Sequence, residues 1–196
     1  MFTRRLFAPL CTSPFAALLL AVLLLSAPTV RGQSADKSPD TRYVPMHMQS
    51  GTWDAAVTFY ANDQPSGTAK GVQTNTLLQN GHWIVNQFRI PASGKFPAYE
   101  GHGVWGYDPV AKTWVDTWVD TNDMAVRTSY GFWSDREQSM TWSSKQPNGS
   151  GQWTDFRIIE KYEGADRRTL TFYQLGVMTA RPIKLVEMVF TRRANS

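Results

Sequence analysis

The chain has 196 residues, enough for one domain of ordinary size together with a short leader. Its 20 basic residues outnumber its 16 acidic ones, but Arg4, Arg5 and Arg31 lie in the first 32 residues, so the remainder has 17 basic against 16 acidic residues. That remainder holds no basic run or stripe, and we therefore expect no nucleic acid among its partners.

Residues 1–32 have the features of a signal peptide. Arg4 and Arg5 form a positive n-region, and the apolar run from Phe15 to Leu25 is shorter than the about 20 residues that span a bilayer. We expect cleavage after Gly32, with Ala27 as the alternative and an uncleaved anchor as another. The arginine pair leaves twin-arginine export open beside ordinary secretion. Both routes predict a periplasmic or secreted protein that does not insert into a membrane once the leader is removed.

Cofactor and metal signals are weak throughout the chain. The single cysteine, Cys11, lies in the leader, so the mature chain has no thiol for a disulfide, a nucleophile or a metal ligand. The histidines His47, His82 and His102 are scattered and do not form a metal-binding spacing. The sequence therefore predicts neither a cofactor nor a metal.

The mature chain reads as a polar linker over residues 33–44 followed by one all-β domain over residues 45–196. Residues 45–48 are compatible with a short helix or plug at one mouth. Alternating apolar residues between turn signals predict ten strands, at 53–60, 67–78, 83–90, 99–107, 113–120, 125–133, 138–143, 153–162, 169–175 and 183–191. Ten short strands joined by short turns predict an antiparallel meander closed into a barrel.

The segment from Glu100 to Thr141 is unusually rich in glycine and aromatic residues. Five tryptophans fall within it or directly after it, namely Trp105, Trp114, Trp118, Trp133 and Trp142. So much aromatic surface requires a deep core or a cavity. A barrel built around such residues predicts binding or chemistry inside a pocket.

Several short motifs carry a resemblance to a known family. They are Gly51-Thr52-Trp53, Asn80-Gly81-His82-Trp83, the block from Gly101 to Asp108, Trp118-Val119-Asp120, and Thr191-Arg192-Arg193. Together they resemble a bacterial domain-of-unknown-function family of secreted proteins with a calycin-type, lipocalin-like β-barrel. The resemblance covers nearly the whole mature chain. It implies a barrel with a pocket for a small ligand, and it supplies no catalytic residues.

The glycines of this block also match a dinucleotide fingerprint, Gly101-x-Gly103-x-x-Gly106. That motif requires a loop between a strand and a helix, whereas here the glycines lie in an aromatic-rich strand. We expect instead that bulky rings approach the glycine backbone closely.

Three residues are candidates for acid or base chemistry. His102 and Glu100 point to the same side of one strand, either at a cavity mouth or on a solvated outer face. Asp116 and Asp120 share a strand face with Trp114 and Trp118. If that face points inward, both carboxylates need partners, for which Arg89 or Arg157 could serve. If the opposite Val and Thr face points inward, they are solvated.

The functional prediction is a barrel that binds a small apolar or aromatic molecule in its cavity without catalysis. One alternative is an isomerase or cyclase that uses Asp116, Asp120 or His102, and another is a filled barrel that acts through its surface in the envelope. The predicted ligand-binding residues are aromatic rings of the central strands with three polar anchors: Trp83, Trp105, Tyr107 and Trp118, with Gln87, Arg89 and Glu187.

Overall fold

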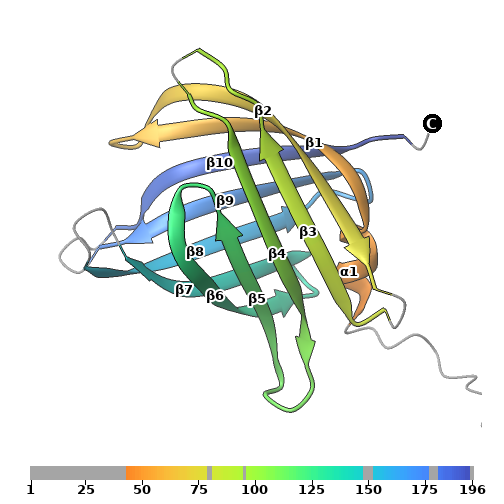
Figure 1. The fold of residues 1–196 in the computed structure, drawn as a ribbon. Helices are drawn as coiled ribbons and strands as arrows, with labels where there is room; N and C mark the ends of the chain where they lie inside the picture. Colours follow the sequence, from red (N-terminus) through yellow and green to blue (C-terminus); the bar gives the residue numbers. More distant parts are fainter. Residues whose placement is uncertain (1–42, 79–80, 95, 148–151, 177–180, 195–196) are drawn as a thin grey trace, which may run out of the picture. The chain divides into compact units, whose positions relative to one another are not determined.

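The computed structural model describes residues 43–78, 81–94, 96–147, 152–176 and 181–194, and Figure 1 shows their arrangement. One short helix, α1 (Val44–Gln49), precedes ten strands. The strands are β1 (Gly51–Ala61), β2 (Gln64–Leu77), β3 (Trp83–Ile90), β4 (Tyr99–Asp108), β5 (Thr113–Asp120), β6 (Asp123–Ser134), β7 (Ser139–Pro147), β8 (Trp153–Tyr162), β9 (Arg167–Leu175) and β10 (Ile183–Arg192).

The ten strands close into a single barrel in which every neighbouring pair is antiparallel. The first strand closes it, because Trp53 of β1 lies opposite Gln73 of β2 on one side and opposite Arg192 of β10 on the other. Closure leaves no free sheet edge. The all-β fold and the closed antiparallel meander predicted from the sequence are therefore confirmed.

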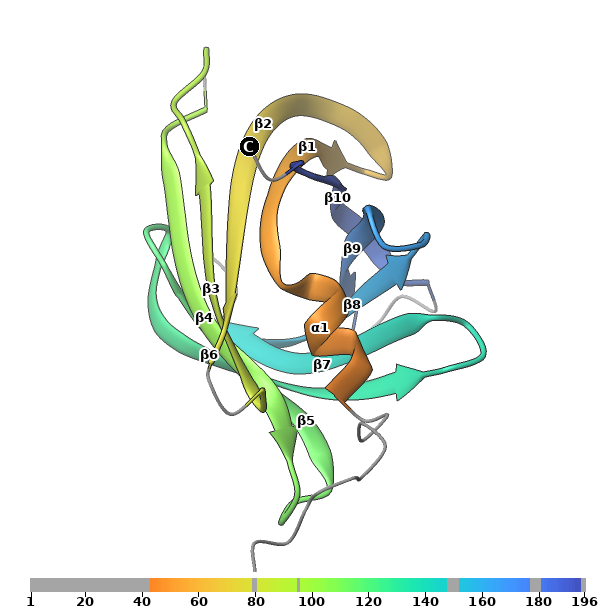
Figure 2. The ribbon, with the colours of Figure 1, turned by 90° about the vertical axis from the view of Figure 1, so that its right-hand side faces the viewer.

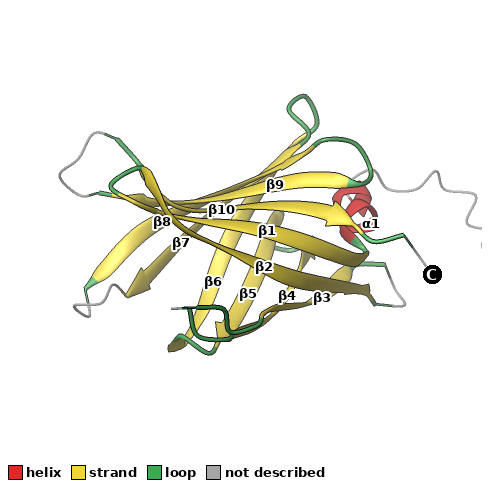
Figure 3. Cartoon of the chain, turned by 90° about the horizontal axis from the view of Figure 1, so that it is seen from above, coloured by secondary structure: helices red, strands yellow, loops and turns green. Residues whose placement is uncertain are grey.

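Helix α1 lies across one end of the barrel, as Figures 2 and 3 show. Met46 is fully buried and packs with Ile84, Trp105 and other core residues. At the C-terminal end of α1, the Arg192 side chain donates hydrogen bonds to the backbone carbonyls of Met48 and of the C-cap residue Ser50, which have no partner within the helix. The short helix expected over residues 45–48 is present, and it begins at Val44, one residue inside the expected linker.

The orientation of β5 decides what the barrel contains. Gly103 of β4 lies opposite Trp118, and the added Cβ of an alanine at either Gly101 or Gly103 would overlap the Trp118 indole. The indole therefore lies against two residues that have no side chain, and the Trp and Asp face of β5 points inward. Val119, on the other face, is exposed. This settles the alternative that the sequence left open.

The predicted leader and most of the predicted linker lie outside the described residues. Among the residues that are described, no helix has the length and apolar character needed to cross a bilayer.

Candidate functional site

The barrel interior contains a cavity of about 770 Å³ that is partly open to solvent and reaches Gln49 of α1. Most of its wall is apolar and comes from nearly all strands; the apolar lining residues are Phe59, Phe88, Ile90, Phe96, Pro97, Tyr99, Trp105, Trp118, Trp142, Ile158, Leu170, Phe172, Leu185, Val186, Met188 and Phe190. Pockets for small molecules usually have such a volume and such a wall, together with a few placed polar groups.

A buried polar network forms the cavity floor on the α1 side. Glu160 of β8 and Arg168 of β9 make an ion pair, and both side chains are almost completely buried. Arg168 also donates to Gln73, whose amide donates to Asn86 over 3.0 Å. Gln49 of α1 donates to Glu160 over 2.6 Å. The network therefore ties the helical plug to four strands, β2, β3, β8 and β9.

The guanidinium of Arg168 is also enclosed by rings. Its Cζ atom lies 3.9 Å from the centroid of the Phe190 ring and 4.8 Å from that of the Trp53 ring. Cation–π contacts of this kind stabilise a desolvated cation. The Nε atoms of Arg168 and Arg127 are buried and have no hydrogen-bond partner among the described residues.

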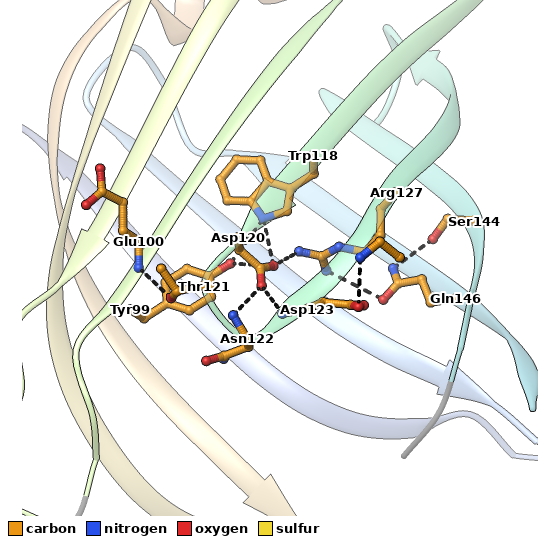
Figure 4. Close-up of polar contacts among 11 residues, drawn as sticks. Tyr99, Glu100, Trp118, Asp120, Thr121, Asn122, Asp123, Arg127, Ser144 and Gln146 are labelled. Atoms are coloured by element: carbon orange, nitrogen blue, oxygen red, sulfur yellow. Dashed lines mark hydrogen bonds and ion pairs between the residues drawn. The ribbon is translucent and has the colours of Figure 1, made fainter. Parts of the chain in front are cut away.

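A second polar cluster lies at the opposite end, where Asp120 is the common acceptor (Figure 4). One carboxylate oxygen of Asp120 accepts from Trp118 Nε1 and from the Tyr99 hydroxyl, both at 3.1 Å, and from Arg127. The other oxygen accepts the backbone N–H groups of Asn122 and Asp123. With five donors, this carboxylate is fully engaged in holding the Trp118 indole and the β5–β6 turn.

The geometry of this cluster also affects Tyr99. Burial, with the nearby Asp120 carboxylate as the next cause, raises the pKa of the Tyr99 hydroxyl to about 12. The hydroxyl therefore keeps its proton and donates a hydrogen bond to Asp120 at any physiological pH. The contacts of Asp120 do not depend on titration of the tyrosine.

Asp116 lies between the two clusters and is not engaged by either of them. It faces the cavity, with Trp105 and Ser129 as its cross-strand neighbours. Among the described residues it has no hydrogen-bond or ion-pair partner. Desolvation raises the pKa of Asp116 to about 7, and Arg127 lowers it by less than this burial raises it.

Of the predicted ligand-binding residues, the structure places Trp105 and Trp118 in the cavity wall. Tyr107 points to the same side of β4 but packs edge-on against Trp114 near α1, with ring centroids 5.5 Å apart, and it does not line the cavity. Asp116 and Asp120 both line it, and the partner of Asp120 is Arg127 rather than Arg89 or Arg157.

Placement of Trp83, Gln87 and Arg89 in the cavity was wrong. These residues alternate with Ile84, Asn86, Phe88 and Ile90, which are all buried, so the predicted residues point outward. Apart from Asn86, the buried set is wholly apolar, and burying it is more favourable than burying an arginine and a glutamine.

Glu187 was also placed on the wrong face. A bulge in β10 puts both Leu185 and Val186 on the cavity side, so Met188 and Phe190 face inward and Glu187 faces outward. On the outer surface Glu187 pairs with Lys184 over 2.7 Å. Apolar residues occur on both faces of this strand, so the alternation alone does not reveal the bulge.

His102 lies on the outer face of β4, where its Nε2 is 2.8 Å from a Glu100 oxygen. The same oxygen accepts from Arg89 over 2.9 Å and from Gln87 over 3.3 Å. The Arg89 hydrogen bond, followed by that of His102, lowers the pKa of Glu100 to about 2. His102 is therefore part of a solvated surface cluster, which is the outer-face alternative of the sequence analysis, and it is not an acid or base inside the barrel.

Sequence reasoning missed three charged residues of the cavity: Arg127, Glu160 and Arg168. Glu160 follows Phe156 and Ile158 on one face of its strand, and a lone charge on an apolar face signals an internal ion pair. Arg168 was overlooked because the strand was expected to begin at Thr169, whereas β9 begins at Arg167. Within the described ranges, no group of three or more His, Cys, Asp or Glu side chains is placed to hold a metal ion.

Comparison with known proteins identifies the family. The chain belongs to DUF1579, a family of proteins of unknown function whose sequence profile matches residues 39–192. This confirms the family resemblance predicted from the sequence. No curated protein matches the chain.

Similarity to solved structures concerns the fold alone. The crystal structure of Rv2717c from M. tuberculosis has 9% sequence identity and a TM-score of 0.55, and the match covers 81% of this chain and all of the other. A redesigned β-barrel has 9% identity and a TM-score of 0.40 over 76% of this chain and 95% of its own.

Proposed function

We propose that this DUF1579 barrel binds a small, largely apolar molecule in its interior cavity and does not transform it. The observation that carries the proposal is the cavity itself, about 770 Å³ in volume and walled mainly by aromatic and aliphatic side chains. A barrel that acted only through its surface would gain stability from filling this space, because close packing is the usual state of a protein interior.

The polar groups of the cavity favour binding over catalysis. Asp120 is engaged by five donors, and Glu160 by Arg168 and Gln49. Among the cavity-lining residues that the structure describes, Asp116 alone has a carboxyl group without a hydrogen-bond or ion-pair partner. General acid–base chemistry usually needs a second group within hydrogen-bond reach of the same reacting atom. One carboxyl group in an apolar cavity is better suited to orient a ligand.

The ligand site is proposed to work outside the cytoplasm. Support comes from the leader-like composition of residues 1–32, with its two arginines before an apolar run. Mass spectrometry of the protein isolated from its native envelope should find an N-terminus near Gln33. An N-terminus that still carries residues 1–32 would contradict this location.

The binding proposal is tested by titrating the purified protein with N-phenyl-1-naphthylamine, an apolar dye whose emission rises on leaving water. We expect saturable binding. Leu170→Trp places a bulky indole ring in the cavity and should weaken dye binding by about 10-fold or more.

Thr169→Trp is the matched control, because Thr169 is the adjacent residue of β9 and its side chain lies on the outer surface, where it donates to Glu163. It should leave the dye affinity within about 3-fold. If the wild type does not bind the dye, or if both variants bind as the wild type does, the cavity is not the ligand site.

A further inference from the structure

The unengaged carboxyl group of Asp116 points to the chemical class of the ligand. Resting on the proposed function above, we infer that the cavity takes a hydrophobic amine, whose protonated nitrogen pairs with Asp116 and whose alkyl or aromatic body lies along the apolar wall.

The first support is the position of Asp116. It lines the cavity, and none of the described residues gives it a hydrogen bond or an ion pair. The residues opposite it on the neighbouring strands are Trp105 and Ser129. A ligand in the cavity therefore meets this carboxyl group directly, without displacing a protein partner.

The second support is the balance of charge in the cavity wall. Four carboxyl groups line it, from Asp116, Asp120, Asp123 and Glu160, against the two guanidinium groups of Arg127 and Arg168.

Both arginines are already committed. Arg127 donates to Asp120 and, over 3.5 Å, to Gln146, while Arg168 donates to Glu160 and Gln73. The Nε atoms that they leave unpaired are buried. Neither arginine of the wall is therefore paired with Asp116, and an ammonium group on the ligand would supply a cation there.

The third support is the aromatic surface around this position. Trp105, Trp118 and Trp142 all line the cavity. Indole faces attract cations more strongly than other aromatic rings do, and desolvation increases the attraction. Such a wall accepts both the charge and the apolar body of an amine, whereas a ligand carboxylate would face Asp116 with no free guanidinium.

The test compares three ligands of equal length, namely decylamine, 1-decanol and decanoate, by displacement of N-phenyl-1-naphthylamine at pH 7.4. We expect decylamine to bind more tightly than 1-decanol by about 10-fold or more, and decanoate to bind the most weakly of the three. The Asp116→Asn substitution should weaken the affinity for decylamine by about 10-fold or more and change the affinity for 1-decanol by less than about 3-fold.

The matched control is Glu187→Gln, which removes one carboxylate charge from the outer surface, where Glu187 pairs with Lys184 over 2.7 Å and does not line the cavity. This variant should keep the preference for the amine within about 3-fold. An unchanged affinity of Asp116→Asn for 1-decanol shows that the variant has kept the fold of the cavity.

The pH dependence provides a second readout. The charged groups around Asp116 are Asp120 of β5, Arg127 of β6, Glu160 of β8 and Arg168 of β9. They form two ion pairs within the wall, Asp120 with Arg127 and Glu160 with Arg168. Burial raises the pKa of Asp116 to about 7, so the carboxyl group gains its negative charge between pH 5.5 and pH 8. Decylamine affinity should therefore rise over this range, whereas 1-decanol affinity should not.

Two results would overturn the inference while leaving the proposed function standing. One is 1-decanol or decanoate binding as tightly as decylamine, and the other is Asp116→Asn retaining the preference for the amine. If none of the three ligands nor the dye binds, the proposed function fails together with the inference.

Discussion

The contact between Trp118 and Gly101 allows a quantitative test of the barrel interior. A Cβ atom at position 101 would lie 2.2 Å from Trp118 Cζ2 and 2.7 Å from Cε2, and its three nearest neighbours are all atoms of this indole. Because Asp120 holds the indole in place, the ring cannot simply swing away. We expect Gly101→Ala to lower the free energy of unfolding by about 1–3 kcal/mol, the usual range for overpacking.

The same substitution should behave differently once the indole is gone. In a Trp118→Leu background the clash is removed, and alanine restricts the unfolded chain more than glycine does. Gly101→Ala should then be neutral or stabilising by up to about 1 kcal/mol. Urea unfolding of the four proteins, followed by far-ultraviolet circular dichroism, gives the coupling energy between the two positions.

An equal cost of Gly101→Ala in both backgrounds would refute the reasoning. It would mean that Trp118 does not lie against Gly101, and therefore that the Trp face of β5 does not point into the barrel.

Three further predictions concern charged groups. Glu160→Gln should lower the free energy of unfolding by about 3–5 kcal/mol, because it leaves Arg168 buried without a counterion. The surface substitution Glu100→Gln should lower it by less than about 1 kcal/mol. Equal losses for the two variants in urea unfolding would contradict this. Burial raises the pKa of Asp116 from 3.8 to about 7, so the folded state retains a proton that the unfolded chain releases. Wild-type stability relative to Asp116→Asn should therefore fall as the pH rises from 4 to 7, by about 4 kcal/mol at most, and then level off; parallel curves from urea unfolding would exclude a raised pKa. Arg192→Gln should increase amide hydrogen exchange in α1, because it removes the donors to the last helical carbonyls; unchanged exchange would show that the helix is held by packing alone.

The strand content of the barrel could be predicted from sequence because most strands have one clearly apolar face. β3 illustrates both the strength and the failure of this reasoning. Its bounds, Trp83–Ile90, are those predicted. The prediction chose the wrong face of the strand as the inward one, although Ile84, Phe88 and Ile90 form the more apolar set. A strand with aromatic or aliphatic residues on both faces carries two compatible patterns, and only its neighbours decide between them.

For β5 the deciding neighbours are the glycines of β4. Trp114 and Trp118 alternate with Val115 and Val119, so hydropathy favours neither face. The register places Trp118 opposite Gly103, where the missing side chain leaves room for an indole. A sequence prediction that paired the two strands would have found this complementarity, but the pairing register is not available from one strand alone.

The polar groups of the cavity were the least predictable part of the site. Arg127 meets Asp120 across a hairpin, which is a local relation and could have been inferred from the turn. Arg168 meets Gln73, 95 residues away in the chain, and Gln49 meets Glu160 across 111 residues. Such pairs exist only because the barrel closes and α1 folds over its end, so no local pattern indicates them.

Occupation of the cavity can be observed directly by methionine-methyl NMR of the protein labelled with ¹³C at its methionine methyl groups. Met188 of β10 lines the cavity, whereas Met48 of α1 does not, so the two residues report on the interior and on a position outside the site. During a titration with decylamine, the account predicts a saturable shift of the Met188 methyl resonance while that of Met48 stays in place. A Met188 resonance that does not move, while ligand binding is detected by other means, would place the ligand elsewhere and contradict the central claim.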